Sequence, residues 1–231
     1  MLSQAMILAA GRGERMRPLT DSCPKPLLEV RGKPLIQYHL EAFARAGFND
    51  LVINTAWLGE QIELCFPPKQ AAPGIRYSHE GKDFGAALET AGGIARALPL
   101  LADCFWLAGG DVYAPRFEFS HAALERFEAG GKLAHIVLVA NPAHNLKGDF
   151  GLGIDGVALR DGAPRYTYST IGMYRREFFS SLPTGNPQGL KAPLAPLLRA
   201  AMDNAQVSGE LYTGAWTDVG TPERLAQLNT P

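Results

Sequence analysis

The chain has 231 residues, of which 46% are hydrophobic, and its 22 Lys and Arg residues nearly balance its 23 Asp and Glu residues. A net charge of −1 argues against a general nucleic-acid binder, because no overall positive field would attract phosphates. No stretch approaches the roughly 20 apolar residues of a membrane span, and three widely spaced cysteines without a C-x-x-C pair favour a cytoplasmic protein over a disulfide framework or a zinc site.

Strand and helix patterns alternate through the first half of the chain. An apolar run at residues 5–10 predicts a buried strand, and Pro34 opens a helix that Gly47 closes. The pattern continues with strands at 51–54, 75–78 and 104–108 and with helices at 59–66 and 90–98. This rhythm predicts an α/β fold with a doubly wound, mostly parallel sheet.

The second half is less regular. Its composition predicts helices at 119–129 and 194–204, strands at 134–140 and 166–174, and a glycine-rich hairpin at 151–161. Thr221 and Pro222 are typical of the first turn of a final helix. Residues 183–193, rich in proline and glycine, are the best candidate for a mobile loop. Without repeats or a linker, the chain is expected to form one domain over residues 1–231.

A glycine loop follows the first predicted strand. Gly11 and Gly13 allow a tight turn, and four cationic side chains come soon after them, namely Arg12, Arg15, Arg17 and Lys25. Backbone N–H groups backed by Arg and Lys suit a polyphosphate, so the loop indicates a nucleoside triphosphate site. The alternative is an ordinary turn. The loop is not a dinucleotide fingerprint, because Met16 stands where the third glycine is needed, and it has no Walker Gly-Lys-Ser/Thr.

Two aspartates are candidate metal ligands. Asp111 follows the strand at 104–108, and Asp218 lies between apolar residues and a glycine turn. Mg²⁺ prefers carboxylates together with phosphate oxygens, so a convergent pair would bind it beside the nucleotide. Each aspartate could equally be a turn residue or a helix cap.

These motifs resemble the signature of the sugar-1-phosphate nucleotidyltransferases. The matching segments are AGRGERMRPLT at 10–20, PKPLL at 24–28, GKPLI at 32–36, LETAGG at 88–93, Gly110-Asp111, and WTDVGT at 216–221. Within the family the closest likeness is to the N-acetylmuramate α-1-phosphate uridylyltransferases of peptidoglycan recycling, through NTAWLG at 54–59 and KGDF at 147–150. The resemblance implies a Rossmann-like (GT-A-like) nucleotidyltransferase fold, with a nucleotide-binding half at 1–112 and a sugar-binding half at 113–231.

The resemblance also implies a role for individual residues. Arg15 would hold the β- and γ-phosphates of UTP, and Lys25 would bridge the α-phosphate and the sugar phosphate. The other nucleotide contacts would be Ala10, Gly11, Gly13, Glu80, Glu89 and Thr90. Mg²⁺ would be bound by Asp111 and Asp218, and the sugar pocket would include Gly151, Ser169 and Thr170.

The chain departs from the family pattern at three places. Gly109 replaces an asparagine, residues 84–87 look like an insertion after Glu80, and Thr170 stands where a glycine is usual. A lactyl carboxylate on the sugar would also require a nearby cation, for which the sequence offers Lys147, Arg165 and Lys191.

The partners implied are UTP and a sugar 1-phosphate, with no nucleic acid and no membrane, for a monomer or a small homo-oligomer. Several alternatives use the same scaffold: a mannose-1-phosphate guanylyltransferase, a glucose-1-phosphate thymidylyltransferase or, less well matched, a choline-phosphate cytidylyltransferase. A sugar-nucleotide sensor or regulatory subunit is the non-enzymatic alternative.

Overall fold

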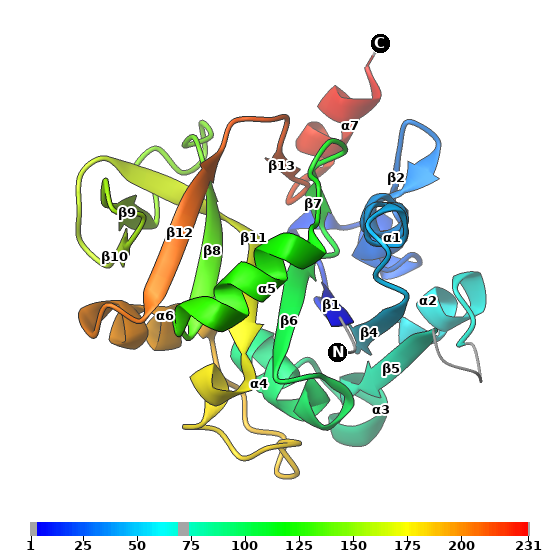
Figure 1. Ribbon diagram of the computed structural model, residues 1–231. Coiled ribbons are helices and arrows are strands. Elements are labelled where there is room, and N and C mark those ends of the chain that lie inside the picture. The colour runs from blue at the N-terminus through cyan, green and yellow to red at the C-terminus, as the bar shows by residue number, and fades with distance from the viewer. Residues whose placement is uncertain (1–3, 69–73, 231) are drawn as a thin grey trace.

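The computed structural model describes residues 4–68 and 74–230, which fold around a nine-stranded mixed sheet (Figure 1). The strand order is β10-β9-β11-β6-β1-β4-β5, and β8 pairs with both β11 and β12. The strands are β1 (Gln4–Ala9), β4 (Asp50–Thr55), β5 (Ile75–His79), β6 (Cys104–Gly109), β8 (Ala134–Val139), β9 (Phe150–Leu152), β10 (Ala158–Leu159), β11 (Arg165–Arg175) and β12 (Val207–Tyr212).

The half of the sheet built from β6, β1, β4 and β5 is parallel, and β11 runs antiparallel to β6, β8 and β9. The prediction of a doubly wound, mostly parallel α/β sheet is therefore confirmed. Parallel strands need crossover connections, and the helices that provide them and the later ones are α1 (Leu35–Arg45), α2 (Gly59–Cys65), α3 (Glu80–Phe84), α4 (Glu89–Ala97), α5 (His121–Gly130), α6 (Leu194–Asp203) and α7 (Pro222–Asn229).

Side chains of β1 alternate between two cores. Ala5, Ile7 and Ala9 belong to the core that includes residues of α1, α2 and α5, whereas Met6 belongs to the core that includes residues of α4 and α6. Alternation with both faces buried explains why β1 is apolar without a break. The two cores hold the sheet rigid, and its carboxyl-end loops are left free to bind ligands.

A small third core lies at the carboxyl end of the sheet. Two short antiparallel pairs, β2 (Glu29–Val30) with β3 (Lys33–Pro34) and β7 (Val112–Tyr113) with β13 (Thr217–Asp218), meet α7 there (Figure 1). The buried residues of this third core include Met16, Val30, Tyr113 and Val219. No residue of α7 itself is buried; its Leu225 and Leu228 pack half-buried against this core.

The predicted elements are all present, with end-points that shift by one or two residues, and the 151–161 segment forms the β9–β10 hairpin. The structure adds β12, which pairs along its whole length with β8, and α3, whose last residue, Phe84, is the first of the segment that looked like an insertion. The predicted loop at 183–193 is anchored by Asn186, whose buried amide bonds the backbone of Gly92 and Leu190. Among the described helices none is both long and apolar enough to cross a membrane.

Candidate functional site

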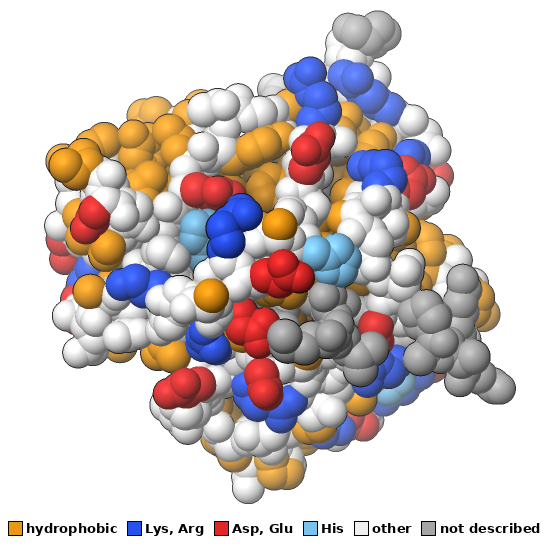
Figure 2. All heavy atoms as spheres, viewed as in Figure 1, with side chains coloured by type: hydrophobic (Ala, Val, Ile, Leu, Met, Phe, Trp, Pro, Cys, Tyr) orange, Lys and Arg blue, Asp and Glu red, His pale blue; other side chains and the backbone are white. Residues whose placement is uncertain are grey.

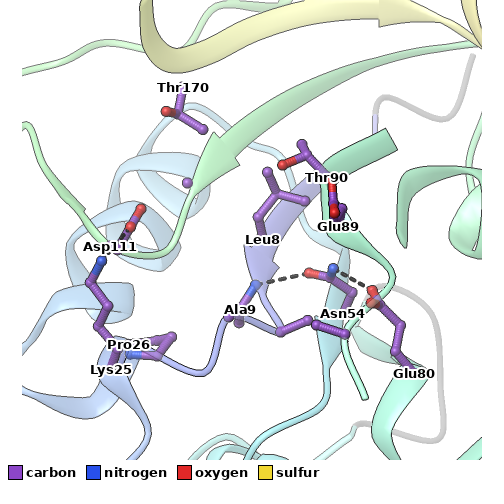
Figure 3. A pocket seen from close by; sticks show the side chains of 15 residues that line it. Leu8, Ala9, Lys25, Pro26, Asn54, Glu80, Glu89, Thr90, Asp111 and Thr170 are labelled. Atoms are coloured by element: carbon purple, nitrogen blue, oxygen red, sulfur yellow. Dashed lines mark hydrogen bonds and ion pairs between the residues drawn. The ribbon is translucent and has the colours of Figure 1, made fainter. Parts of the chain in front are cut away.

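A cavity of about 320 Å³ lies at the carboxyl ends of β1, β4 and β6 (Figure 3). It brings together nine of the predicted nucleotide, metal and sugar residues from six separate segments of the chain. Of the predicted residues, its lining contains Ala10, Gly11, Gly13, Lys25, Glu80, Glu89, Thr90, Asp111 and Thr170. The glycine loop and Asp111 therefore face one crevice, as their positions after β1 and β6 predict.

The glycine loop is held in place by its own side chains. Gly13 has φ +68°, and a Cβ there would lie 3.0 Å from the Thr20 side chain, so any larger residue at this position would be strained. The Thr20 hydroxyl donates to the Gly13 carbonyl at 2.9 Å. Arg12 donates to the Thr20 carbonyl and to Asp21 and stacks over the Trp57 ring, 3.8 Å from its centroid. Arg12 thus contributes to the shape of the loop.

Lys25 is the cation of this region that points into the cavity. Its side chain is 11% exposed, and Nζ lies 2.6 Å from Oδ2 of Asp111 (Figure 3). Arg17 pairs instead with Asp21 at 2.8 Å. Because this ion pair faces the cavity, an incoming anion could take the place of Asp111 beside Lys25, and a cation could take the place of Lys25 beside Asp111.

The two aspartates converge through the β7–β13 pair. Asp218 lies opposite Val112, and the N–H of Val219 donates to the Asp111 carbonyl at 2.9 Å. The Asp218 carboxylate contacts Arg224 at 2.5 Å and His144 at 2.9 Å. The fold therefore brings the backbones of Asp111 and Asp218 together, and the binding of a metal by the two carboxylates stays a prediction.

This pair fits Mg²⁺ better than a metal that needs a full protein cage. Among the described residues there is no group of three or more His, Cys, Asp or Glu side chains arranged as a metal site. Two carboxylates leave most positions to phosphate oxygens and water, the arrangement that Mg²⁺ adopts with nucleotides.

Arg15 and Asp218 stand outside the lining of the cavity. Arg15 is exposed, and its guanidinium lies beside Gly220, where a Cβ would come within 3.1 Å of Nη2. Arg224 flanks the same glycine. These two arginines therefore mark the outer end of the crevice, next to the turn that carries Asp218.

Glu80 is fully buried and joins three segments by hydrogen bonds. The N–H of Ala9 donates to Asn54 Oδ1 at 2.8 Å, and Asn54 Nδ2 donates to Glu80 Oε1 at 2.6 Å (Figure 3). The N–H of Leu88 donates to the other oxygen of Glu80 at 2.7 Å. Burial raises the pKa of the Glu80 carboxyl, and these two hydrogen bonds act against that rise. The contacts of Glu80 support a role in positioning the segment before α4, and its predicted contact with the nucleotide stays a prediction.

A second cavity, of about 510 Å³, adjoins the first and shares Glu89, Thr90 and Thr170 with it. Two of these shared residues have left-handed backbones, Glu89 with φ 59° and Thr170 with φ 61°. Thr170 lies in the irregular stretch of β11 where its pairing with β8 shifts between Tyr168 and Gly172. Bulges and strained residues of this kind are frequent beside active sites.

Two predicted sugar contacts lie behind the wall of the second cavity. Ser169 is fully buried, and its hydroxyl donates to the Val137 carbonyl at 2.7 Å. Gly151 is buried against Gly162 in the β9–β10 hairpin. Their neighbours Phe150, Tyr168 and Thr170 line the cavity in their place.

None of the three candidate cations for a lactyl carboxylate lines the second cavity. Arg165 uses its guanidinium to bond the carbonyls of Asp149, Lys147 and Arg160. The sequence analysis missed Asp149 and Arg199, which do line the cavity. Asp149 stands within the KGDF segment that carried part of the resemblance, whereas Arg199 gave no motif signal beyond its place on an amphipathic helix.

Comparisons with known proteins identify relatives of this chain. The sequence profile of the family described as Nucleotidyl transferase matches residues 4–153. An N-acetylmuramate alpha-1-phosphate uridylyltransferase of Neisseria meningitidis serogroup B is 47% identical, over 97% of this chain and 96% of its own length. A protein of the same name from Caulobacter vibrioides is 31% identical, over 95% of this chain and 92% of its own length.

The fold has a counterpart among solved structures. A crystal structure from Bacillus anthracis, assigned as a glucose-1-phosphate thymidylyltransferase in complex with sucrose, superposes with a TM-score of 0.77. It covers 98% of this chain and 94% of that one at 18% identity, so the likeness concerns the fold.

Proposed function

Because this chain belongs to the nucleotidyl transferase family, we propose that it transfers a uridylyl group from UTP to N-acetylmuramate α-1-phosphate. The observation that carries the proposal is the pair of adjoining cavities with Lys25 and Asp111 in the first and a shared wall at Thr170. One cavity suits the nucleotide, the other suits the sugar, and their junction is where the two phosphates would meet. The high identity to relatives of that activity supports the choice of substrates.

The reaction needs positioning and charge stabilisation more than acid–base chemistry. An oxygen of the sugar phosphate attacks the α-phosphorus of UTP, a new P–O bond forms, and the α–β anhydride bond breaks to release pyrophosphate. The attacking phosphate is already ionised, so no protein base has to remove a proton. This requirement agrees with a cavity whose charged groups are a lysine and three carboxylates.

Lys25 would lie between the two reacting phosphates. Opposite charges about 4 Å apart attract by about 4 kcal/mol at an effective dielectric constant of about 20, which offsets the repulsion between the two anions. On the described contacts, Lys25 would leave Asp111 and move toward the phosphates as the nucleotide enters. Arg15, beside Gly220, would hold the departing pyrophosphate.

Asp111 and Asp218 would hold Mg²⁺, which when bound neutralises charge on the phosphates. The neighbouring strands β7 and β13 bring their backbones together, which supports this assignment. Before the metal binds, Lys25 forms an ion pair with Asp111, and Arg224 and His144 contact Asp218. We propose a cytoplasmic location and a part in peptidoglycan recycling as consequences of the substrate alone.

The proposal is tested by pyrophosphate release. Purified protein with Mg²⁺ is given each of UTP, dTTP, GTP and CTP with N-acetylmuramate, glucose and mannose 1-phosphates. Turnover restricted to UTP and N-acetylmuramate α-1-phosphate is expected. Turnover with another pair would retain the reaction and overturn the substrate, and ligand-dependent melting without pyrophosphate would favour a sensor.

Lys25→Ala should lower kcat by about a hundredfold or more, the usual loss for one group that stabilises transition-state charge. The matched control is Lys132→Ala, since Lys132 bonds the Ala205 carbonyl away from both cavities. Equal melting temperatures would show that both variants fold. A Lys25→Ala rate within threefold of the wild type would contradict the role given to this lysine.

A further inference from the structure

The second cavity has a marked chemical asymmetry along α6. Leu194, Leu198 and Met202 form the buried stripe of this helix. Ala195 and Arg199, one position further round, are also four residues apart and therefore share a face. Leu194, Ala195, Leu198 and Arg199 all line the cavity, so the exposed Arg199 follows the apolar residues of this wall.

Arg199 is the sole Lys or Arg among the lining residues of this cavity, where the acidic residues are Glu89 and Asp149. Asp149 is already engaged, since its carboxylate oxygens accept from Asn145 Nδ2 at 3.1 Å and from the Tyr168 N–H at 2.9 Å. Neither acid is paired with Arg199 in the described part of the chain. An exposed arginine at a cavity wall without a carboxylate partner is suited to bind a carboxylate from a ligand.

The other cations near α6, Lys191 among them, do not line this cavity. Arg160 pairs with Asp203 at 2.9 Å, at the carboxyl end of the helix. Arg165 gives its guanidinium to backbone carbonyls. The described contacts therefore leave Arg199 as the cation that can serve the second cavity.

We propose that Arg199 binds the carboxylate of an acidic sugar substituent and so selects a carboxylated sugar 1-phosphate over a neutral one. The assignment rests on the proposed function, in which this cavity receives the sugar. The planar guanidinium would hold the carboxylate through two parallel hydrogen bonds. Leu194, Ala195 and Leu198 would cover the methyl groups that such substituents carry.

The test is a double-mutant-type cycle that combines one substitution in the protein with one change in the sugar substrate. The wild type and Arg199→Ala are compared on N-acetylmuramate α-1-phosphate and on its lactyl amide, which has the same shape without the charge. For the acid, Arg199→Ala should raise KM about 10-fold to 100-fold, the size of a charged hydrogen bond, with a smaller change in kcat. For the amide, the two proteins should differ by less than threefold, because the interaction is already absent.

Arg199→Lys should show a smaller rise in KM than Arg199→Ala, since lysine keeps the positive charge but cannot make the two parallel hydrogen bonds of a guanidinium. The matched control is Arg160→Ala, which removes a cation from the same neighbourhood outside the cavity. Melting temperatures and the KM for UTP check that each variant is intact.

The outcomes separate this inference from the proposed function. Wild-type turnover of N-acetylmuramate α-1-phosphate together with an unchanged KM in Arg199→Ala would overturn the role of Arg199 alone. Equal losses on the acid and on the amide would also overturn it, because the effect would then be unrelated to charge. If the wild type uses only a neutral sugar 1-phosphate, the proposed substrate and this assignment both fail.

Discussion

Thr170 combines a β-branched side chain with a left-handed backbone, φ 61°, at the junction of the two cavities. Such residues are uncommon because the Cβ crowds the backbone. A Cβ on Gly109 would lie 3.0 Å from Cγ2 of Thr170. The two departures from the family pattern at 109 and 170 are therefore complementary: the threonine fills space that a side chain at 109 would need.

The strain at Thr170 can be measured with two substitutions. Thr170→Gly should be more stable than Thr170→Ala by about 1 kcal/mol, because glycine has no left-handed penalty. At an ordinary position alanine is the more stable of the two by about 0.5–1 kcal/mol. Urea unfolding of both variants, with the same pair at Thr217 as a control, gives the answer. Alanine more stable than glycine at 170 would show that the backbone there is unstrained.

Among single residues, the sequence could predict those that belong to a recognisable local motif. Lys25 and Asp111 belong to segments of fixed spacing, and the structure places them together. Arg199 and the bonds of Glu80 could not be predicted in this way. Their roles depend on Asn54, Leu88 and the wall of α6, which are brought near only by the fold.

Among the elements, β1, β4 and α3 are linked by the Ala9–Asn54–Glu80 chain of hydrogen bonds, which continues to Leu88 just before α4. The direction of donation in this series of hydrogen bonds is fixed at both ends by backbone N–H groups. The Ala9 N–H requires Asn54 to present its oxygen, so the Asn54 amide faces Glu80 as a donor. The Leu88 N–H is a second fixed donor. Residue 80 must therefore accept twice, which a carboxylate does and an amide does not.

Glu80→Gln places an N–H against an N–H whichever way the amide turns. An unsatisfied buried donor costs about 1–3 kcal/mol, so the segment before α4 should shift and take with it Glu89 and Thr90, which line the first cavity. We therefore expect KM to rise about tenfold for each nucleoside triphosphate. The exposed Glu60 on α2 provides the control Glu60→Gln. Unchanged KM values would contradict the positioning role, and a change in the preference among bases would indicate direct contact between Glu80 and the base.

The predicted elements of the parallel half were found because buried strands and amphipathic helices repeat there with regular periods. β12 was missed because Val207–Tyr212 contains serine, glycine and glutamate and takes its strand form from pairing with β8. α3 was missed because five residues are too few to show a helical period. Short elements of this kind depend on tertiary contacts for their structure.

For the whole molecule, acid stability depends in part on a buried histidine of α1. His39 is 1% exposed, and its Nε2 lies 2.9 Å from the Val112 carbonyl, next to Asp111. Burial lowers the pKa of His39 to about 4. The unfolded chain, with a pKa of about 6.5, takes up a proton that the folded chain excludes. Stability is therefore present above pH 6.5 and is lost as the pH falls toward 4.

Between pH 7.5 and pH 5 this histidine should cost the fold about 2 kcal/mol of unfolding free energy. His39→Gln keeps a donor for the Val112 carbonyl and removes the titration. Urea unfolding at the two pH values should show a wild-type loss that exceeds the loss of the variant by this amount. Parallel losses in the two proteins would mean that other groups set the acid limit.

The weak packing of α7 affects how the protein loses activity on heating. The two large cores hold the sheet, but α7 buries no residue of its own and depends on the small third core, on the Thr221 cap and on the Arg224–Asp218 contact. Segments with so few buried contacts open in local fluctuations well below the free energy of global unfolding. Each opening would take Arg224 away from Asp218 and expose the third core beside the turn that carries Asp218, while the sheet stays intact. On heating, the protein should therefore lose activity reversibly at a temperature below its melting temperature, because a folded but inactive population forms first.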